Sequence, residues 1–270
     1  MLRQAWLVRM HRQATRCGYL MLWATSGLLS FSAFLGRILK VGIQFQWLKR
    51  PTVIHVLIRQ MYFTGIQSLS WILFLSVSVG LLSIYSLVAF AQTIENLPLI
   101  GKLFRDIFVI EMTPILISVF LLARSGVALI TEVGHMHLRR EHLLLRSLGI
   151  GVEEYLYLPR MVAFISCHLI LCFVFITLSL WLSTLFISWH GDMSAFRFLA
   201  ELRQESSLEA LLILMLKSFL FSFLSCGVLL YHGSRMLNNP NLLPIHATYG
   251  VLGSLMLMIA LDVMIGVLLW

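Results

Sequence analysis

Charged residues are scarce in this sequence: they make up 12% of its 270 residues, whereas 59% of the residues are hydrophobic. Soluble domains carry about a quarter charged residues, so the composition excludes a soluble globular enzyme. It also excludes an intrinsically disordered chain, because disorder requires low hydrophobicity together with high net charge. The class that remains is a polytopic membrane protein with most of its residues inside the bilayer.

Recognisable catalytic, metal-binding and nucleotide-binding motifs are also missing. The four cysteines form no C-x-x-C pair, which argues against a zinc or redox site. The sequence contains no G-x-x-x-x-G-K-[ST], Rossmann glycine pattern, H-E-x-x-H or G-x-S-x-G. We therefore expect no cofactor and no metal, and if ATP drives this protein, another chain binds it. An intramembrane enzyme stays a minor alternative, because no spacing of Ser, His and Asp indicates a nucleophile with its base.

Acidic residues are absent before Glu95, although nine basic residues occur there. Because tryptophans and leucines are interleaved with this charge, it indicates a segment at the cytoplasmic membrane surface rather than a nucleic-acid site. The basic clusters at residues 3–16 and 37–59 can share that side only if the apolar run between them lies in the interface or dips into the membrane and returns. We therefore expect residues 1–50 to form a basic segment with an interfacial elbow helix, followed by a membrane domain over residues 51–270.

Five apolar stretches are long enough to cross the hydrocarbon core, which takes about 20 helical residues. They lie at about residues 60–91, 107–134, 157–188, 208–232 and 246–270. With the N-terminus in the cytoplasm and the C-terminus outside, fifteen basic residues lie on the inner side and four on the outer side, as the positive-inside rule requires. The predicted fold is an all-α polytopic membrane protein with an interfacial helix and five transmembrane helices.

A short amphipathic helix is predicted at about residues 138–149, in the connection between the second and third transmembrane helices. Leucines recur there at helical spacing, and two glycines follow. A passive connector and a helix through which a cytoplasmic partner moves the membrane helices both explain this composition. The charged residues between the leucines are Arg139, Arg140, Glu141 and Arg146.

Ionisable residues inside the predicted transmembrane helices are the strongest candidates for a functional site. Each is costly in lipid, so each must face a partner, a cavity or the interface. Arg124 and Glu132 are eight residues apart, about two turns, and therefore lie on one helix face. Contacts between helices or subunits explain these residues, and so does a polar lining of a substrate path. The candidates are Glu111, Arg124, Glu132, Lys217 and Asp262.

Five stretches, in order, carry a family resemblance that spans the chain from about residue 55 to its end. They read IRQMYFTGIQSL at 58–69, EMTPILISVFLLARSGVALITEVGHM at 111–136, LPR at 158–160, LKSFLFSFLSCGVLLYHG at 216–233 and LDVMIGVLLW at 261–270. Together they resemble the MlaE-type permeases of ABC transporters. Glu111 and Pro114 stand at the Glu-x-x-Pro signature of that family. Arg124, Glu132, Lys217 and Asp262 also stand at positions where the family has the same residues.

The resemblance implies a function and a set of partners. Such permeases lie in the bacterial inner membrane and pair with a second copy or a paralogue around a central lipid cavity. The helix at about 138–149 binds a cytoplasmic ABC ATPase, which hydrolyses the ATP, so the permease itself is not an enzyme. A periplasmic MCE-domain protein covers the cavity, and phospholipids or related lipids move between the inner membrane and the outer envelope. The alternative is a structural subunit that tethers partners without transporting a substrate.

The sequence departs from the family pattern in two places. Ile110 occupies the position before the signature Glu where the family usually has Arg. The coupling helix is usually acidic and is followed by Asn-Pro or Asp-Pro, whereas residues 139–143 read RREHL and Gly151 and Val152 replace the dipeptide. A basic coupling helix predicts an ATPase with a complementary acidic groove, or a divergent half of a heterodimer.

Overall fold

The computed structural model describes residues 26–44, 46–93, 99–190, 195–205, 208–236 and 240–269. These ranges contain helices and short connections, without strands. Six helices are long and apolar enough to cross a membrane: Ser26–Ile43, Pro51–Phe90, Ile100–Leu138, Glu153–Trp189, Leu208–Ser234 and Pro240–Leu268. The predicted all-α membrane fold is confirmed.

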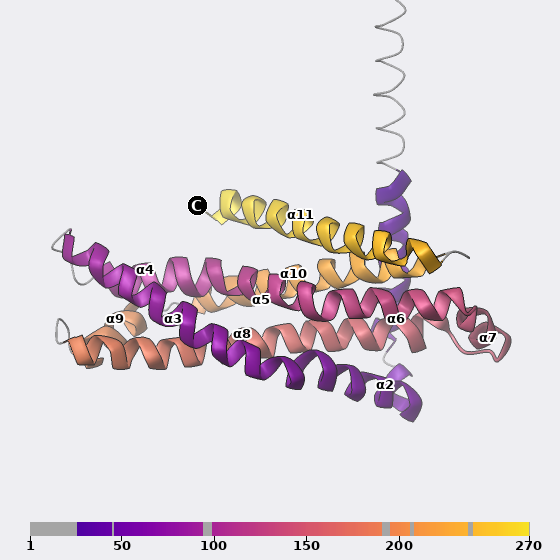
Figure 1. The fold of residues 1–270 in the computed structure, drawn as a ribbon, viewed down its shortest axis with the longest axis horizontal. Helices are drawn as coiled ribbons and strands as arrows, with labels where there is room; N and C mark the ends of the chain where they lie inside the picture. Colours follow the sequence, from indigo (N-terminus) through magenta and orange to yellow (C-terminus); the bar gives the residue numbers. More distant parts are fainter. Residues whose placement is uncertain are drawn as a thin grey trace, which may run out of the picture.

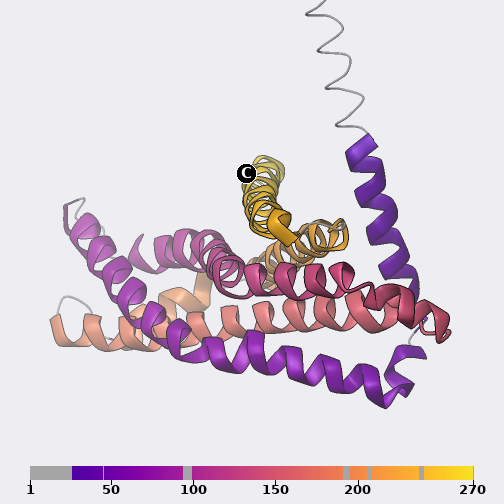
Figure 2. The ribbon, with the colours of Figure 1, turned by 45° about the vertical axis from the view of Figure 1, so that its right-hand side comes forward.

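The first of these six, the N-terminal helix Ser26–Ile43, runs across the bundle instead of along it (Figure 1). It remains steeply inclined to the long helices after the view is turned by 45° (Figure 2). This orientation is the one expected of the interfacial helix that the sequence predicts. Aromatic contacts dock it, because the ring of Phe34 lies 5.1 Å from Tyr157 and the ring of Phe31 lies 5.5 Å from Tyr231. The described part of the predicted segment 1–50 begins at residue 26.

We call the five long helices rods, and the first three rods are each assembled from two or more helical segments. The first rod joins α2 (Pro51–Met61), the π-helical turn η2 (Tyr62–Ile66) and α3 (Gln67–Thr93), after the 3₁₀ turn η1 (Gln46–Lys49). The second joins α4 (Leu99–Leu103), η3 (Phe104–Met112), α5 (Thr113–Leu121), η4 (Leu122–Gly126) and α6 (Val127–Leu138), where η3 and η4 are π-helical. The third joins the π-helical η5 (Glu153–Tyr157) to α8 (Leu158–His190).

The last two rods are α10 (Leu208–Ser234) and α11 (Leu243–Leu269), with the 3₁₀ turn η6 (Pro240–Leu242) before α11. Two shorter helices cap the bundle: α7 (Glu141–Ser147) at one end and α9 (Ala195–Glu205) at the other (Figure 1). We call these the α7 end and the α9 end. The N-terminal helix lies at the α7 end.

Most rods are longer than the apolar stretches from which they were predicted. The second begins near Ile100 and the third at Glu153, whereas the sequence predicted starts at about 107 and 157. Charged residues such as Lys102 and Glu153 end an uncharged run, but they do not stop a helix, since both are compatible with helical backbone at a membrane interface.

Small and hydroxylated residues hold α3 against α8 at close range. Ser76 donates a hydrogen bond to the carbonyl oxygen of Phe175 (2.9 Å), and its hydroxyl lies 2.8 Å from that of Ser179. A Cβ on Gly80 would come within 3.1 Å of the Cα of Ser179. Helices in lipid associate through this kind of close packing and interhelical hydrogen bonding. Apolar side chains gain little free energy by moving from lipid tails into a helix interface, so the hydrophobic effect does not drive the association.

The surface of the bundle is apolar. Trp71, Phe74, Phe173 and Met256 each expose more than three fifths of their area, which suits contact with lipid rather than water. α11 is the most peripheral of the long rods, because it packs mainly on α10 and also on α6. Much of its apolar face is therefore open to lipid or to another chain.

Candidate functional site

Lys217 stands at the centre of an ionic cluster that joins three rods. Its ammonium group donates to Oε2 of Glu111 at 2.6 Å and to Oδ1 of Asp262 at 3.0 Å. Glu111 comes from η3, Lys217 from α10 and Asp262 from α11. The structure thus brings together three of the five intramembrane residues singled out from the sequence, although they are far apart along the chain.

Burial within the ionic cluster is uneven. The side chain of Lys217 is 1% exposed, whereas those of Glu111 and Asp262 are 33% and 22% exposed. An unpaired ammonium in this environment would cost several kcal/mol, so the two carboxylates stabilise it. Because two carboxylates share one cation and keep part of their surface open, the cluster can also accept hydrogen bonds from a ligand outside the chain.

The backbone around Glu111 is unusual, and the sequence explains why. Pro114 lies in the first turn of α5, and proline has no N–H to donate to the carbonyl one turn earlier. The π-helical stretch η3 lies directly before it, and Thr113 donates its hydroxyl to the carbonyl of Phe108 at 2.9 Å. Interrupted hydrogen-bond ladders of this kind frequently occur at functional sites.

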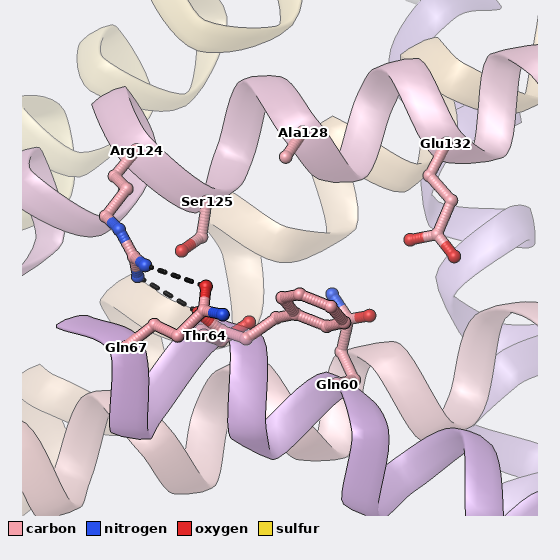
Figure 3. A pocket seen from close by; sticks show the side chains of 8 residues that line it. Gln60, Thr64, Gln67, Arg124, Ser125, Ala128 and Glu132 are labelled. Atoms are coloured by element: carbon pink, nitrogen blue, oxygen red, sulfur yellow. Dashed lines mark hydrogen bonds between the residues drawn. The ribbon is translucent and has the colours of Figure 1, made fainter.

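A second polar site lies between the first two rods, closer to the α7 end. Gln60, Phe63, Thr64 and Gln67 line it from the first rod, and Arg124, Ser125, Ala128 and Glu132 line it from the second (Figure 3). We call it the arginine pocket; its volume is about 180 Å³. The sequence predicted that Arg124 and Glu132 share a helix face, and both do line this pocket.

Arg124 and Glu132 do not pair with each other. Arg124 donates to the carbonyl of Phe63 at 3.0 Å, to Oε1 of Gln67 at 3.3 Å and to the hydroxyl of Ser68. Glu132 accepts from Nη2 of Arg160 at 2.7 Å. The two residues therefore mark opposite ends of one pocket.

Arg160 is the residue that sequence reasoning missed. It was counted as a charge in a connection between helices, but its side chain is only 3% exposed, and it also donates to the carbonyl of Leu156 at 2.7 Å. The only available signal was its place in the L-P-R stretch of the family resemblance.

α7 presents apolar and basic side chains on the outside of the bundle. The helix starts after Arg140, whose φ is +59°, and ends in a Schellman motif at Gly149, whose φ is +71°. This left-handed residue at position 140 separates α7 from α6 and makes it shorter than the predicted helix at 138–149. Leu144 and Leu148 are 61% and 65% exposed.

Histidines connect α7 to the bundle. The ring of His142 stacks on His137 at 4.2 Å, and His137 is hydrogen-bonded to the hydroxyl of Tyr157 at 2.7 Å. Partial burial, followed by the positive charges of Arg146 and Arg140, lowers the pKa of His142 below its usual value. His142 is therefore mostly neutral at pH 7, which suits ring stacking.

The N-terminal segment is tied to the same end by charge. Arg50 lies 3.1 Å from Glu154, and Arg37 lies 3.8 Å from Glu153. The two glutamates open the third rod directly after the α7 connection. The N-terminal segment therefore contacts the start of the third rod, which follows α7 along the chain.

Comparison with known proteins agrees with this architecture. No curated protein matches the chain. The family model described as Permease MlaE matches residues 57–268, which include most or all of each of the five long rods, together with α7 and the ionic cluster. A permease of this kind is the membrane component of an ABC transporter and not a catalytic enzyme. The chain, a multi-pass membrane protein, belongs to the MlaE permease family.

Proposed function

We propose that this chain is the permease subunit of an ABC transporter that moves phospholipids, or related lipids, between the inner membrane and the outer envelope. The observation that carries the proposal is the ionic cluster. Glu111 and Asp262 are partly exposed carboxylates within an otherwise apolar surface. Such a site offers acceptors to a polar head group while the surrounding apolar surface accommodates acyl chains.

A pair of permeases supplies the cavity in this proposal. The exposed apolar face of α11 carries Met256, Ile259 and Val263, each more than half exposed. Asp262 lies on the same helix. A second copy, or a paralogue, packed near this face would enclose the ionic cluster from both sides. Lipid would then meet the carboxylates inside a cavity instead of on an open surface.

The α7 end faces the cytoplasm in this proposal. The basic N-terminal helix and α7 lie at that end together (Figure 1), as the positive-inside rule favours. The C-terminus then lies on the periplasmic side, where an MCE-domain protein would cover the cavity. A separate ABC ATPase would dock on α7 through Leu144 and Leu148, with an acidic groove facing Arg140 and Arg146.

Purification from the native host tests the partners. The protein is extracted in mild detergent, and bound proteins and lipids are identified by mass spectrometry. We expect an ABC ATPase, an MCE-domain protein and phospholipid. An intact complex that contains partners but neither ATPase nor lipid would favour the tethering subunit instead.

Lipid transfer tests the activity. The complex is reconstituted in vesicles, and ATP-dependent transfer of a fluorescent phospholipid to the MCE-domain protein is measured. Glu111→Gln should lower transfer at least about tenfold, because one charge-assisted hydrogen bond contributes about 1.5–3 kcal/mol. Glu209→Gln, at an exposed position in the first turn of α10, is the matched control. Equal transfer by both variants would contradict the proposed role of the ionic cluster.

A further inference from the structure

The arginine pocket contains a buried hydroxyl that has no partner. Thr64 is 1% exposed, and its Oγ1 makes no hydrogen bond with any residue that the structure describes. Unsatisfied buried polar groups are rare, because each costs the free energy of its lost hydration. Thr64 lines the pocket below Ser125, between Arg124 and the Gln60–Glu132 end (Figure 3). A ligand bound in the pocket would supply the hydrogen-bond partner that this hydroxyl lacks.

Arg124 adds a positive charge that has no counter-ion among the described residues. Its three partners, Phe63, Ser68 and Gln67, are all neutral acceptors. In the part of the chain that the structure describes, no carboxylate lies within salt-bridge distance of it. A guanidinium within a transmembrane rod normally finds an anion, a cavity or the interface. Here Arg124 faces a cavity, and an anion bound in that cavity would supply the missing counter-charge.

The backbone at this site is irregular on both sides. Arg124 belongs to the π-helical turn η4, and Phe63 and Thr64 belong to the π-helical turn η2 of the facing rod. The hydrogen bond from Arg124 to Phe63 connects the two turns directly. π-Helical turns widen the helix locally and occur frequently at functional sites. Two facing turns at one pocket indicate a site built for a ligand rather than for packing alone.

The opposite end of the pocket carries the opposite charge. Glu132 is eight residues beyond Arg124, which is about 12 Å along the helix. It accepts one hydrogen bond from Arg160 through Oε1 and is 46% exposed, so its other oxygen can accept from a ligand. The pocket thus has a cationic side chain, Arg124, at one end and a hydrogen-bond acceptor, Glu132, at the other. This arrangement matches a head group in which a phosphate is followed by an ammonium or hydroxyl group.

We propose that the arginine pocket is a second head-group site, in which Arg124 and Thr64 bind the phosphate of a phospholipid and Glu132 accepts from the rest of the head group. The inference rests on the proposed function, since it takes a phospholipid as the cargo. The pocket lies about 20 Å along the second rod from Glu111, towards the α7 end, counted over thirteen helical residues. At about 180 Å³ it holds a head group but not a whole lipid, so the acyl chains stay outside.

Photo-crosslinking tests this site directly. p-Benzoylphenylalanine replaces Ala128, which lines the pocket, in the full complex in nanodiscs. The nanodiscs contain phosphatidylethanolamine and diacylglycerol with identical acyl chains, and adducts are identified by mass spectrometry. We expect phosphatidylethanolamine adducts to exceed diacylglycerol adducts about tenfold, because only the former brings a phosphate to the guanidinium. Equal yields would overturn the proposal.

Matched variants separate binding from folding. The same crosslinker at Ile66 samples the apolar groove on the other side of the first rod, between that rod and α8, and should show no head-group preference.

Arg124→Gln should lower the phospholipid adduct at position 128 about tenfold, the size of a lost charge-assisted contact. Arg124→Lys should retain part of it, and neither should change the yield at position 66. Thr64→Val, which keeps shape and removes the hydroxyl, should also lower the adduct at 128. No loss in any of these variants would refute the phosphate contact.

Further arms identify the source of the phosphate and separate this inference from the proposed function. If millimolar inorganic phosphate displaces the lipid adduct at position 128, the pocket binds free phosphate and the lipid proposal is wrong. If no adduct forms at 128 while ATP-dependent lipid transfer still requires Glu111, the second site is wrong and the transport function stands. If the adduct forms and depends on Arg124 while transfer is absent, the site stands and the transport function fails.

Discussion

Replacing Lys217 by Met should destabilise the protein more than any other single change to the ionic cluster. The side chain is 1% exposed, and it neutralises Glu111 at 2.6 Å and Asp262 at 3.0 Å. Met has a similar length and fills the space, so the loss is one of charge rather than of volume. The two carboxylates would then face each other without a cation.

The expected size follows from measurements on buried ion pairs. Removing one partner of such a pair costs about 3–5 kcal/mol, because the other charge stays buried without compensation. On the scale found for domains of about 150–250 residues, this corresponds to a fall of about 6–20 °C in the apparent unfolding temperature. Partial exposure of Glu111 and Asp262 places the expectation in the lower half of that range, since water and a second chain can reach them.

The assay is thermal unfolding of the purified permease in detergent, monitored by thiol labelling of the buried cysteines. Lys217→Met is compared with the triple variant that also carries Glu111→Gln and Asp262→Asn. The triple variant should recover most of the lost stability, because replacing a whole buried ionic group with neutral residues is often nearly neutral. If Lys217→Met unfolds like the wild type, or if the triple variant is no better than the single one, the ionic cluster does not stabilise the bundle.

Three other changes test the remaining contacts. Reversing Arg140 and Arg146 to Glu should abolish stimulation of the partner ATPase in the reconstituted complex, because the acidic groove we propose would then meet like charge. Glu132→Gln should lower the unfolding temperature by the equivalent of about 1–3 kcal/mol, since Arg160 keeps a hydrogen-bond acceptor there but loses its counter-charge. Gly80→Ala should weaken the packing of α3 on α8 by about 1–3 kcal/mol, measured in the same unfolding assay, because the new methyl would lie 2.9 Å from the hydroxyl of Ser179 and 3.1 Å from its Cα.

Controls for these three changes come from the same chain. Gly266→Ala adds a methyl inside α11 where no neighbouring atom outside the local helix backbone lies within 4 Å, so it should not lower the unfolding temperature. Arg160→Met in the Glu132→Gln background should recover stability, whereas further loss would show that the hydrogen bond from Arg160 to the carbonyl of Leu156 contributes more to stability than the pair with Glu132. Unchanged ATP turnover after reversal of Arg140 and Arg146 would mean that α7 is not the coupling contact.

The fold class followed from sequence because hydrophobicity over about 20 residues is a local property. The end of α7 followed too, since the left-handed residue that closes a Schellman motif is most often glycine, and Gly149 occupies that position. The start of α7 did not follow, because Arg140 adopts a left-handed conformation that is uncommon for a residue other than glycine. α7 is consequently shorter than the helix that the leucine spacing predicted.

Sequence alone thus determined that this is an all-α membrane protein and which ionisable residues the bilayer must accommodate. Only the tertiary structure decided their partners: Lys217 with Glu111 and Asp262, Arg160 with Glu132, and Arg124 with the backbone of Phe63. The physical reason is that partners on different helices meet through the rotation and crossing of whole rods. The rotation and crossing of the rods depend on side-chain packing along the full length of each rod. The periodicity of residues along a single helix does not specify that packing.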